Sequence, residues 1–185
     1  MRNMFRSSIS AVALLLAGLF LYTAHGAAQE MPTETKPGAY LAAGGGLSDY
    51  QIDYGQHVLG GVNVYVDLNA TPRYGMEVEG RWLFVHQAAN VHASTKLIGP
   101  RVKLFQFHGL TTYAKVLAGS GHFNFPYNYA VGNYFVIAPG AGMDIELHHK
   151  IILRVIDVEY QDWPQFTYGS LHPYGVSVGL GYRIF

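Results

Sequence analysis

Gly175-Val-Ser-Val-Gly-Leu-Gly-Tyr-Arg-Ile-Phe185, the end of the chain, carries more structural information than any other stretch of the sequence. Large apolar side chains occupy every second position and alternate with serine, glycine and arginine, and the last residue is aromatic. A strand of a soluble sandwich alternates too, but it rarely buries an arginine and two glycines on one face. An apolar outer face and a small or charged inner face are typical of a strand with lipid outside and a polar lumen inside.

The beginning of the chain has the pattern of a secretory signal peptide. Arg2 and Arg6 precede an apolar run from Ile9 to Tyr22, and small residues follow up to Ala28. A retained membrane anchor is the alternative, but this run is shorter than the ~20 residues that a spanning helix needs. We therefore expect cleavage after Ala28. Residues 29–37 contain two prolines and are predicted to form a flexible periplasmic lead, which leaves residues 38–185 as the folded domain.

The composition suits a membrane barrel and excludes several other classes of protein. The chain has 22 glycines, 14 tyrosines and 10 phenylalanines, and only 13% of its residues are charged. Tyrosine and phenylalanine are typical of membrane interfaces, and glycine suits tight turns and narrow lumens. The absence of cysteine excludes a disulfide framework, a thiolate metal site and a cysteine nucleophile. A net charge of zero without a basic stripe argues against nucleic acid as a partner.

Alternation of apolar and polar residues recurs in eight segments of about the length that a tilted membrane strand needs. Short connections alternate with longer ones, and the long ones fall near 49–57, 85–94, 122–132 and 162–172. This arrangement predicts an eight-stranded antiparallel up-and-down transmembrane β-barrel with short periplasmic turns and longer extracellular loops. A soluble lipocalin-like barrel would point its apolar residues inward instead. The predicted strands are 38–48, 58–68, 74–84, 95–106, 111–121, 133–146, 151–161 and 173–184.

The charged side chains of most strands lie on one parity, opposite to the large apolar side chains. We expect them to point into the lumen and to be paired there, because isolated buried charges are costly. An eight-stranded barrel is only wide enough for its own side chains, so a salt-bridged plug is favoured over a gated narrow conduit. A hairpin at 85–94 would place Glu77 beside Arg101 and Lys103. The predicted lumen network comprises Asp67, Glu77, Glu79, Arg81, Arg101, Lys103, Lys115, Asp144, Glu146, Asp157, Glu159 and Arg183.

The seventh segment departs from this parity rule, because Arg154 is out of phase with Asp157 and Glu159. Either a bulge resets the register, or Arg154 faces lipid and extends to the headgroups. A tight turn near residue 148 would place Arg154 opposite Asp144, which favours the bulge. Two prolines inside other predicted strands, at positions 100 and 139, also predict bulges because proline lacks a hydrogen-bond donor.

Six segments carry a family resemblance, and they are Val78-Glu-Gly-Arg-Trp-Leu83, Gly99-Pro-Arg-Val-Lys103, Tyr113-Ala-Lys-Val116, Gly140-Ala-Gly-Met-Asp144, Leu153-Arg-Val-Ile-Asp-Val-Glu-Tyr160 and Gly181-Tyr-Arg-Ile-Phe185. Their order and spacing resemble the small OmpA-type outer-membrane β-barrels, in particular the single-domain proteins of the outer membrane protein beta-barrel domain group. The resemblance implies insertion by the barrel-assembly machinery, with Tyr182 and Phe185 as the C-terminal assembly signal. In that family the aromatic residue usually lies two positions before the terminal phenylalanine, whereas Tyr182 lies three before.

Some eight-stranded outer-membrane barrels modify lipid A, so an enzymatic alternative has to be weighed. A lipid A deacylase would need a histidine and a serine two positions apart, together with a carboxylate that orients the histidine. His92 and Ser94 have this spacing, and Glu79 or Glu159 would be the orienting carboxylate. His92 falls in a predicted loop, however, and this spacing is common by chance. The neighbouring carboxylates in Glu77 and Glu79, or in Asp157 and Glu159, are predicted to be structural rather than catalytic.

Histidines also gather in or beside the predicted extracellular loops, where they could meet above one rim. Such a cluster could bind a transition metal or respond to pH, but the spacing matches no metal signature. We therefore predict neither a metal site nor a cofactor. The histidines are His57, His86, His92, His122 and His172.

These patterns together favour a non-enzymatic, monomeric barrel of the Gram-negative outer membrane. Its predicted role is structural or surface interaction, with outer-membrane lipids and lipopolysaccharide as partners. A narrow porin and a lipid A-modifying enzyme are the alternatives. The aromatic loop segments Phe123–Tyr129 and Trp163–Tyr168 are predicted to be the contact surfaces.

Overall fold

The computed structural model describes residues 39–52, 57–85, 91–124, 131–148, 150–164 and 169–184. The predicted signal peptide, residues 1–28, and the predicted lead, residues 29–37, lie outside these ranges. Among the described residues, no helix is long and apolar enough to cross a membrane.

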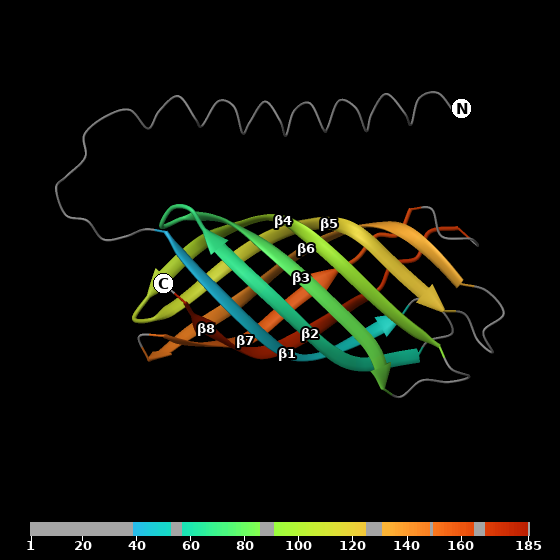
Figure 1. The fold of residues 1–185 in the computed structure, drawn as a ribbon, viewed down its shortest axis with the longest axis horizontal. Helices are drawn as coiled ribbons and strands as arrows, with labels where there is room; N and C mark the ends of the chain where they lie inside the picture. The colour runs from blue at the N-terminus through green and yellow to red at the C-terminus, as the bar shows by residue number, and fades with distance from the viewer. Residues whose placement is uncertain are drawn as a thin grey trace, which may run out of the picture. The chain divides into compact units, whose positions relative to one another are not determined.

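Eight antiparallel strands form one closed barrel in chain order (Figure 1). Each strand pairs with its neighbours in sequence, and β1 closes the barrel by pairing with β8. The predicted eight-stranded up-and-down barrel is thereby confirmed. The strands are β1 (Tyr40–Ile52), β2 (His57–Asn69), β3 (Tyr74–Val85), β4 (His92–Phe107), β5 (Leu110–Asn124), β6 (Val131–His148), β7 (Ile151–Tyr160) and β8 (Tyr174–Arg183).

Short connections join β2 to β3, β4 to β5 and β6 to β7 at one end of the barrel, on the left of Figure 1. We call this the turn end and the opposite end the loop end. The β4–β5 turn consists of His108 and Gly109, whose φ values are 47° and 82°. Both values are left-handed, as the tightest two-residue hairpin turns require. In the β2–β3 turn, the backbone N–H of Tyr74 donates to the Thr71 hydroxyl at 2.9 Å.

Several strands extend further toward the loop end than predicted. β1 continues to Ile52 rather than residue 48, and β5 continues to Asn124 rather than residue 121. Two isolated bridges add to this pairing: Asp162 pairs with Ile137 of β6, and Trp163 pairs with Leu171. The side chains in these extensions explain the added length, because several of them are buried inside the barrel, so backbone pairing continues above the predicted strand ends.

The predicted facing of the strands is confirmed. In β2, Val62 and Val64 are exposed on the outer face, while Asn63 and Asp67 are 2% exposed on the inner face. β7 keeps its charges inside by means of a bulge. Arg154 lies opposite Asp144 of β6, but the next aligned pair toward the loop end is Ile156 with Met143.

The extra residue of this bulge lets Arg154, Asp157 and Glu159 all face the lumen, and all three are buried. The bulge prediction is therefore correct, and lipid does not surround Arg154. The bulges predicted at Pro100 and Pro139 were wrong, because the register runs through both positions without a shift. Each proline ring is exposed on the outer face. The energetic cost of each proline is therefore limited to one missing backbone hydrogen-bond donor between the strands.

Candidate functional site

The lumen is filled by two layers of side chains. Along the inner face of β3, the charged residues Glu77, Glu79 and Arg81 are followed toward the loop end by Leu83, and all four are buried. Leucine, phenylalanine and tryptophan side chains from other strands continue the apolar layer. The lumen is thus charged from its middle toward the turn end and apolar toward the loop end.

Lys115 of β5 is the centre of the charged layer. Its ammonium nitrogen lies 2.8 Å from Glu77, 3.0 Å from Glu79, 2.6 Å from Asp157 and 3.4 Å from Glu159. Three of these side chains, Glu77, Glu79 and Asp157, form the group of potential metal ligands found among the described residues. The Lys115 ammonium occupies the position between their oxygens, so a resident cation is already supplied by the chain itself.

Arg154 joins the carboxylates of four strands. Its guanidinium lies 3.0 Å from Asp67 of β2, 3.2 Å from Glu77 of β3, 3.4 Å from Asp144 of β6 and 3.4 Å from Asp157 of its own strand. Because these strands lie on different sides of the barrel, Arg154 bridges the lumen rather than a single hairpin.

The other two arginines complete the charged layer on either side of Lys115. Arg101 of β4 pairs with Asp67 and Asp144, and its Nε lies 3.6 Å from Glu77. The predicted proximity of Glu77 and Arg101 is therefore present. Arg81 pairs with Glu79, lies 2.6 Å from Glu159, and donates to the Ser48 hydroxyl at 3.3 Å.

Each of these three arginines also stacks on a tyrosine ring inside the barrel. The guanidinium carbon of Arg154 lies 3.5 Å from the centre of the Tyr65 ring, and that of Arg101 lies 3.7 Å from the centre of the Tyr113 ring. A Cβ placed on Gly44 would lie only 2.5 Å from the Tyr65 ring, so glycine is needed in the wall at this position. These cation–π contacts add attraction to the ion pairs in a desolvated site.

Carboxylates outnumber cations in this layer. One oxygen each of Asp67 and Asp157 has no hydrogen-bond donor within the described part of the chain. Six acidic and four basic side chains, all buried, constitute what we call the lumen network: Asp67, Glu77, Glu79, Asp144, Asp157, Glu159, Arg81, Arg101, Lys115 and Arg154.

Three residues predicted for this network lie apart from it, at the turn end. Arg183 pairs with Glu146 at 3.0 Å, and both side chains are about one third exposed. Lys103 does not pair with Glu77 as predicted, because its ammonium lies over the ring of Tyr40, 4.4 Å from the ring centre. Of the predicted assembly signal, Tyr182 faces outward on β8, whereas Phe185 lies outside the described residues.

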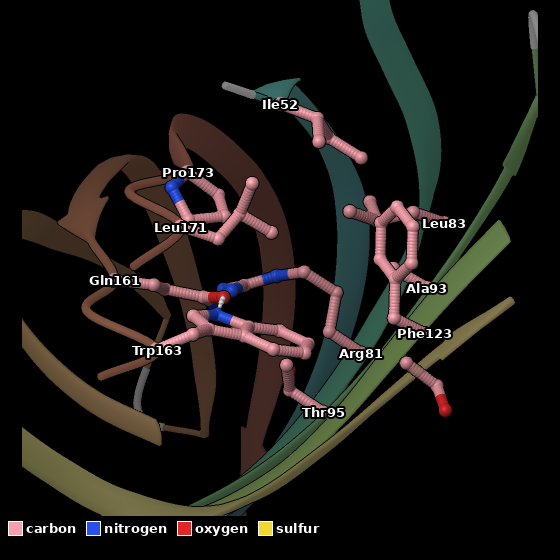
Figure 2. Close-up of a pocket in the computed structure, with 11 residues that line it drawn as sticks. Ile52, Arg81, Leu83, Ala93, Thr95, Phe123, Gln161, Trp163, Leu171 and Pro173 are labelled. Carbon is pink, nitrogen blue, oxygen red and sulfur yellow. Dashed lines mark hydrogen bonds between the residues drawn. The ribbon is translucent and has the colours of Figure 1, made fainter. Parts of the chain in front are cut away.

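The apolar layer closes the lumen at the loop end. Trp163 is 1% exposed and packs against Phe123, with 6.4 Å between the ring centres. Figure 2 shows Trp163 beneath Leu171 and beside the side chain of Gln161. The indole N–H of Trp163 donates to Gln161 at 3.0 Å, and the Gln161 amide donates to Glu159 at 2.8 Å. A polar chain therefore joins the apolar layer to the lumen network.

The predicted role of Trp163 and Phe123 as exposed contact residues is wrong, because packing inside the barrel buries both rings. Positions 125–129 and 165–168 of the same predicted contact segments lie outside the described residues. The apolar layer itself was missed. Its signal was present in the sequence, since Leu83 continues the inward parity of Glu79 and Arg81, and Leu97 continues that of Arg101.

The histidines do not converge in the described part of the chain. His122 lies 2.8 Å from the side chain of Asn133, and His92 lies 3.4 Å from that of Asn124. His172 instead pairs with Asp162 at 3.3 Å. His86 and the side chain of His57 lie outside the described residues.

The geometry also separates the residues of the enzymatic alternative. Ser94 and His92 share a parity on β4 with the outward-facing Ile98, whereas Ala93 and Thr95 face inward and are buried. Glu79 and Glu159, the carboxylates considered as orienting groups, are instead buried in the lumen and paired with Arg81. The barrel wall therefore lies between the proposed pair and these carboxylates.

Two small cavities flank the lumen network. The one at the loop end, between Trp163, Phe123 and Arg81, has a volume of about 10 Å³ (Figure 2). The one at the turn end, lined by Tyr40, Lys103 and residues of the Glu146–Arg183 pair, has a volume of about 30 Å³. A cavity needs about 10–15 Å³ to hold one water molecule, so each has room for very few waters.

Comparison with known proteins identifies the fold. No family model matches the chain, and no curated protein matches its sequence.

Solved structures do match. Neisserial surface protein A is similar with 8% identity and a TM-score of 0.64 over 78% of this chain and 96% of that chain. OprG from Pseudomonas aeruginosa is similar with 10% identity and a TM-score of 0.56 over 80% and 96%. Ail, the attachment invasion locus protein of Yersinia pestis, is similar with 14% identity and a TM-score of 0.54 over 79% and 99%. The chain thus has the transmembrane fold of the small OmpA-type outer-membrane β-barrels.

Proposed function

We propose that this chain is a non-enzymatic barrel of the Gram-negative outer membrane, with a structural or surface-interaction role and a sealed lumen. The observation that carries the proposal is the position of Lys115, whose ammonium is surrounded by Glu77, Glu79, Asp157 and Glu159 in the middle of the barrel. An ion crossing the lumen would have to displace this ammonium and disrupt its ion pairs.

Two further features support a seal. The cavities on either side of the lumen network are about 10 Å³ and 30 Å³, too small for a continuous column of water. Trp163 and its apolar neighbours close the lumen above the network. The loop end, where the longer connections lie, is then the end that faces outward from the cell, as in other outer-membrane barrels.

The proposed partners are the lipids and lipopolysaccharide of the outer membrane, together with the barrel-assembly machinery during insertion. The outer face of the strands supports a lipid partner, because it carries an almost continuous surface of exposed valine, leucine, isoleucine and aromatic side chains. In water such a surface would be an aggregation liability. The chain is proposed to act as a monomer.

A planar-bilayer recording tests the seal. The purified barrel is expected to show no steady conductance, because Lys115 and Arg154 connect carboxylates from several strands across the lumen. Folding of the protein in the same sample is verified by its heat-modifiable gel mobility. Large and stable single-channel steps from the inserted protein would contradict the sealed lumen and support the narrow porin instead.

A further inference from the structure

The outer faces of the neighbouring strands β4 and β5 change from apolar to polar toward the loop end. On β4, Ile98 is followed on the same face by Lys96 and then Ser94. On β5, the exposed Val116 is followed on the same face by Ala118 and then by Ser120 and His122.

The strand register brings the polar side chains of this region together. Lys96 lies opposite Ser120 of β5, and the next outward-facing pair is Ser94 with His122. Directly opposite residues of an antiparallel pair have Cβ atoms about 4.5–5.5 Å apart, and diagonal ones about 7–8 Å. Ser120 therefore lies directly across from Lys96, and Ser94 lies two residues away from Lys96 on the same face of β4. We call Lys96, Ser94 and Ser120 the Lys96 patch.

Aromatic side chains flank the Lys96 patch on both sides. Trp82 of β3 lies opposite Ser94, and Phe135 of β6 lies opposite Ser120. Both rings are exposed on the outer face, at 40% and 48%. Aromatic residues on the outside of a membrane protein mark the level of the lipid headgroups. The Lys96 ammonium is therefore placed among headgroups rather than among acyl chains.

Lys96 is also unusual because it carries a charge on the outer face of the strands. Within the described strands, the exposed charged side chains are Lys96 on β4 and Asp49 on β1. The other basic residues of these strands face the lumen or the turn-end cavity. A single cation flanked by hydroxyls, directly above an apolar surface, matches the phosphate of an anionic lipid whose chains lie along that surface.

We propose that the Lys96 patch binds a phosphate group of lipid A, the phosphorylated glycolipid of the outer leaflet. The Lys96 ammonium pairs with the phosphate, and the hydroxyls of Ser94 and Ser120 donate hydrogen bonds to its oxygens. The acyl chains lie over Ile98 and its apolar neighbours. This inference rests on the proposed outer-membrane location and not on the sealed lumen.

The test is a titration of the purified chain, in micelles of an uncharged detergent, with bisphosphorylated lipid A. Binding is followed by the tryptophan fluorescence of the chain, in which Trp82 is expected to respond because its exposed ring borders the patch, whereas Trp163 is buried in the lumen. Lys96→Gln is expected to weaken binding about fivefold, the contribution of one basic side chain at an anionic lipid surface. Lys96→Arg, which keeps the charge, is expected to restore most of the affinity. The matched control is Lys150→Gln, which removes an exposed lysine at the turn end and leaves binding unchanged.

Three outcomes would overturn the proposal. Equal affinity for dephosphorylated lipid A would show that the phosphate is not recognised. Equal affinity for phosphatidylglycerol would assign the patch to anionic lipids in general. An equal loss of affinity for lipid A in Lys150→Gln would show that a positive charge promotes binding wherever it lies on the barrel. Recovery of the chain outside outer-membrane fractions would instead contradict the proposed function, and it would leave the result of this titration in micelles unchanged.

Discussion

Replacing Lys115 by methionine is expected to lower the free energy of unfolding by at least ~3–5 kcal/mol, the usual cost of removing one partner of a buried ion pair. Methionine preserves most of the side-chain volume, so the loss of stability measures the effect of removing the charge. Without the ammonium, Glu77, Glu79, Asp157 and Glu159 face one another with one cation fewer. The measurement is a guanidinium titration in lipid vesicles, with the folded fraction read from gel mobility.

Two further variants make this result specific. Lys150→Met removes an exposed lysine from the β6–β7 turn and is expected to cost little, because exposed pairs and charges contribute ~1 kcal/mol or less. Asp157→Asn is expected to cost less than Lys115→Met, because carboxylates already exceed cations in the lumen network. Equal losses for Lys115→Met and Lys150→Met would contradict the central role of the ammonium.

Trp163→Ala is expected to destabilise the barrel by ~3–5 kcal/mol, which is typical of truncating a buried large aromatic side chain. The change removes the ring that packs against Phe123, and it enlarges the cavity above Arg81. It also leaves Gln161 without the donor that now reaches its side-chain oxygen at 3.0 Å. The same guanidinium titration measures the loss.

The chain offers a matched control for this change as well, because its second tryptophan, Trp82, is 40% exposed on the outer face. Trp82→Ala is expected to cost clearly less than Trp163→Ala. Trp163→Phe is expected to lie between them, since it keeps an apolar ring but loses the indole donor. If Trp82→Ala and Trp163→Ala cost the same, the apolar layer does not stabilise the lumen.

The alternation of side chains in the sequence was sufficient to predict the strands and their facing, because a strand has a strict period of two. It also predicted the bulge beside Arg154, since the charges of β7 could not otherwise share one face. The alternation could not predict that Arg154 pairs with residues of β2 and β3. Contacts across a barrel depend on the tilt and stagger of all the strands together, which local periodicity does not contain.

Trp163 shows a second limit of the sequence. It follows the last residue of β7 in a region that contains proline and polar residues, so it was assigned to an exposed loop. Its burial depends on Leu171 and Phe123, which are brought to it by the bridge at the loop end and by β5. Such packing between segments distant in sequence has no signature within either segment.

The span of Arg154 across the lumen has a consequence for assembly. Its guanidinium reaches Asp67 and Glu77, which precede it by 87 and 77 positions in the chain. An open sheet of the first six strands would therefore contain these carboxylates without one of their main counter-charges. Only a sheet that includes β7 in the correct register neutralises them. Closure of the barrel and the exclusion of water from its lumen are thus coupled in one cooperative step. Intermediates with mispaired strands remain energetically unfavourable in the bilayer.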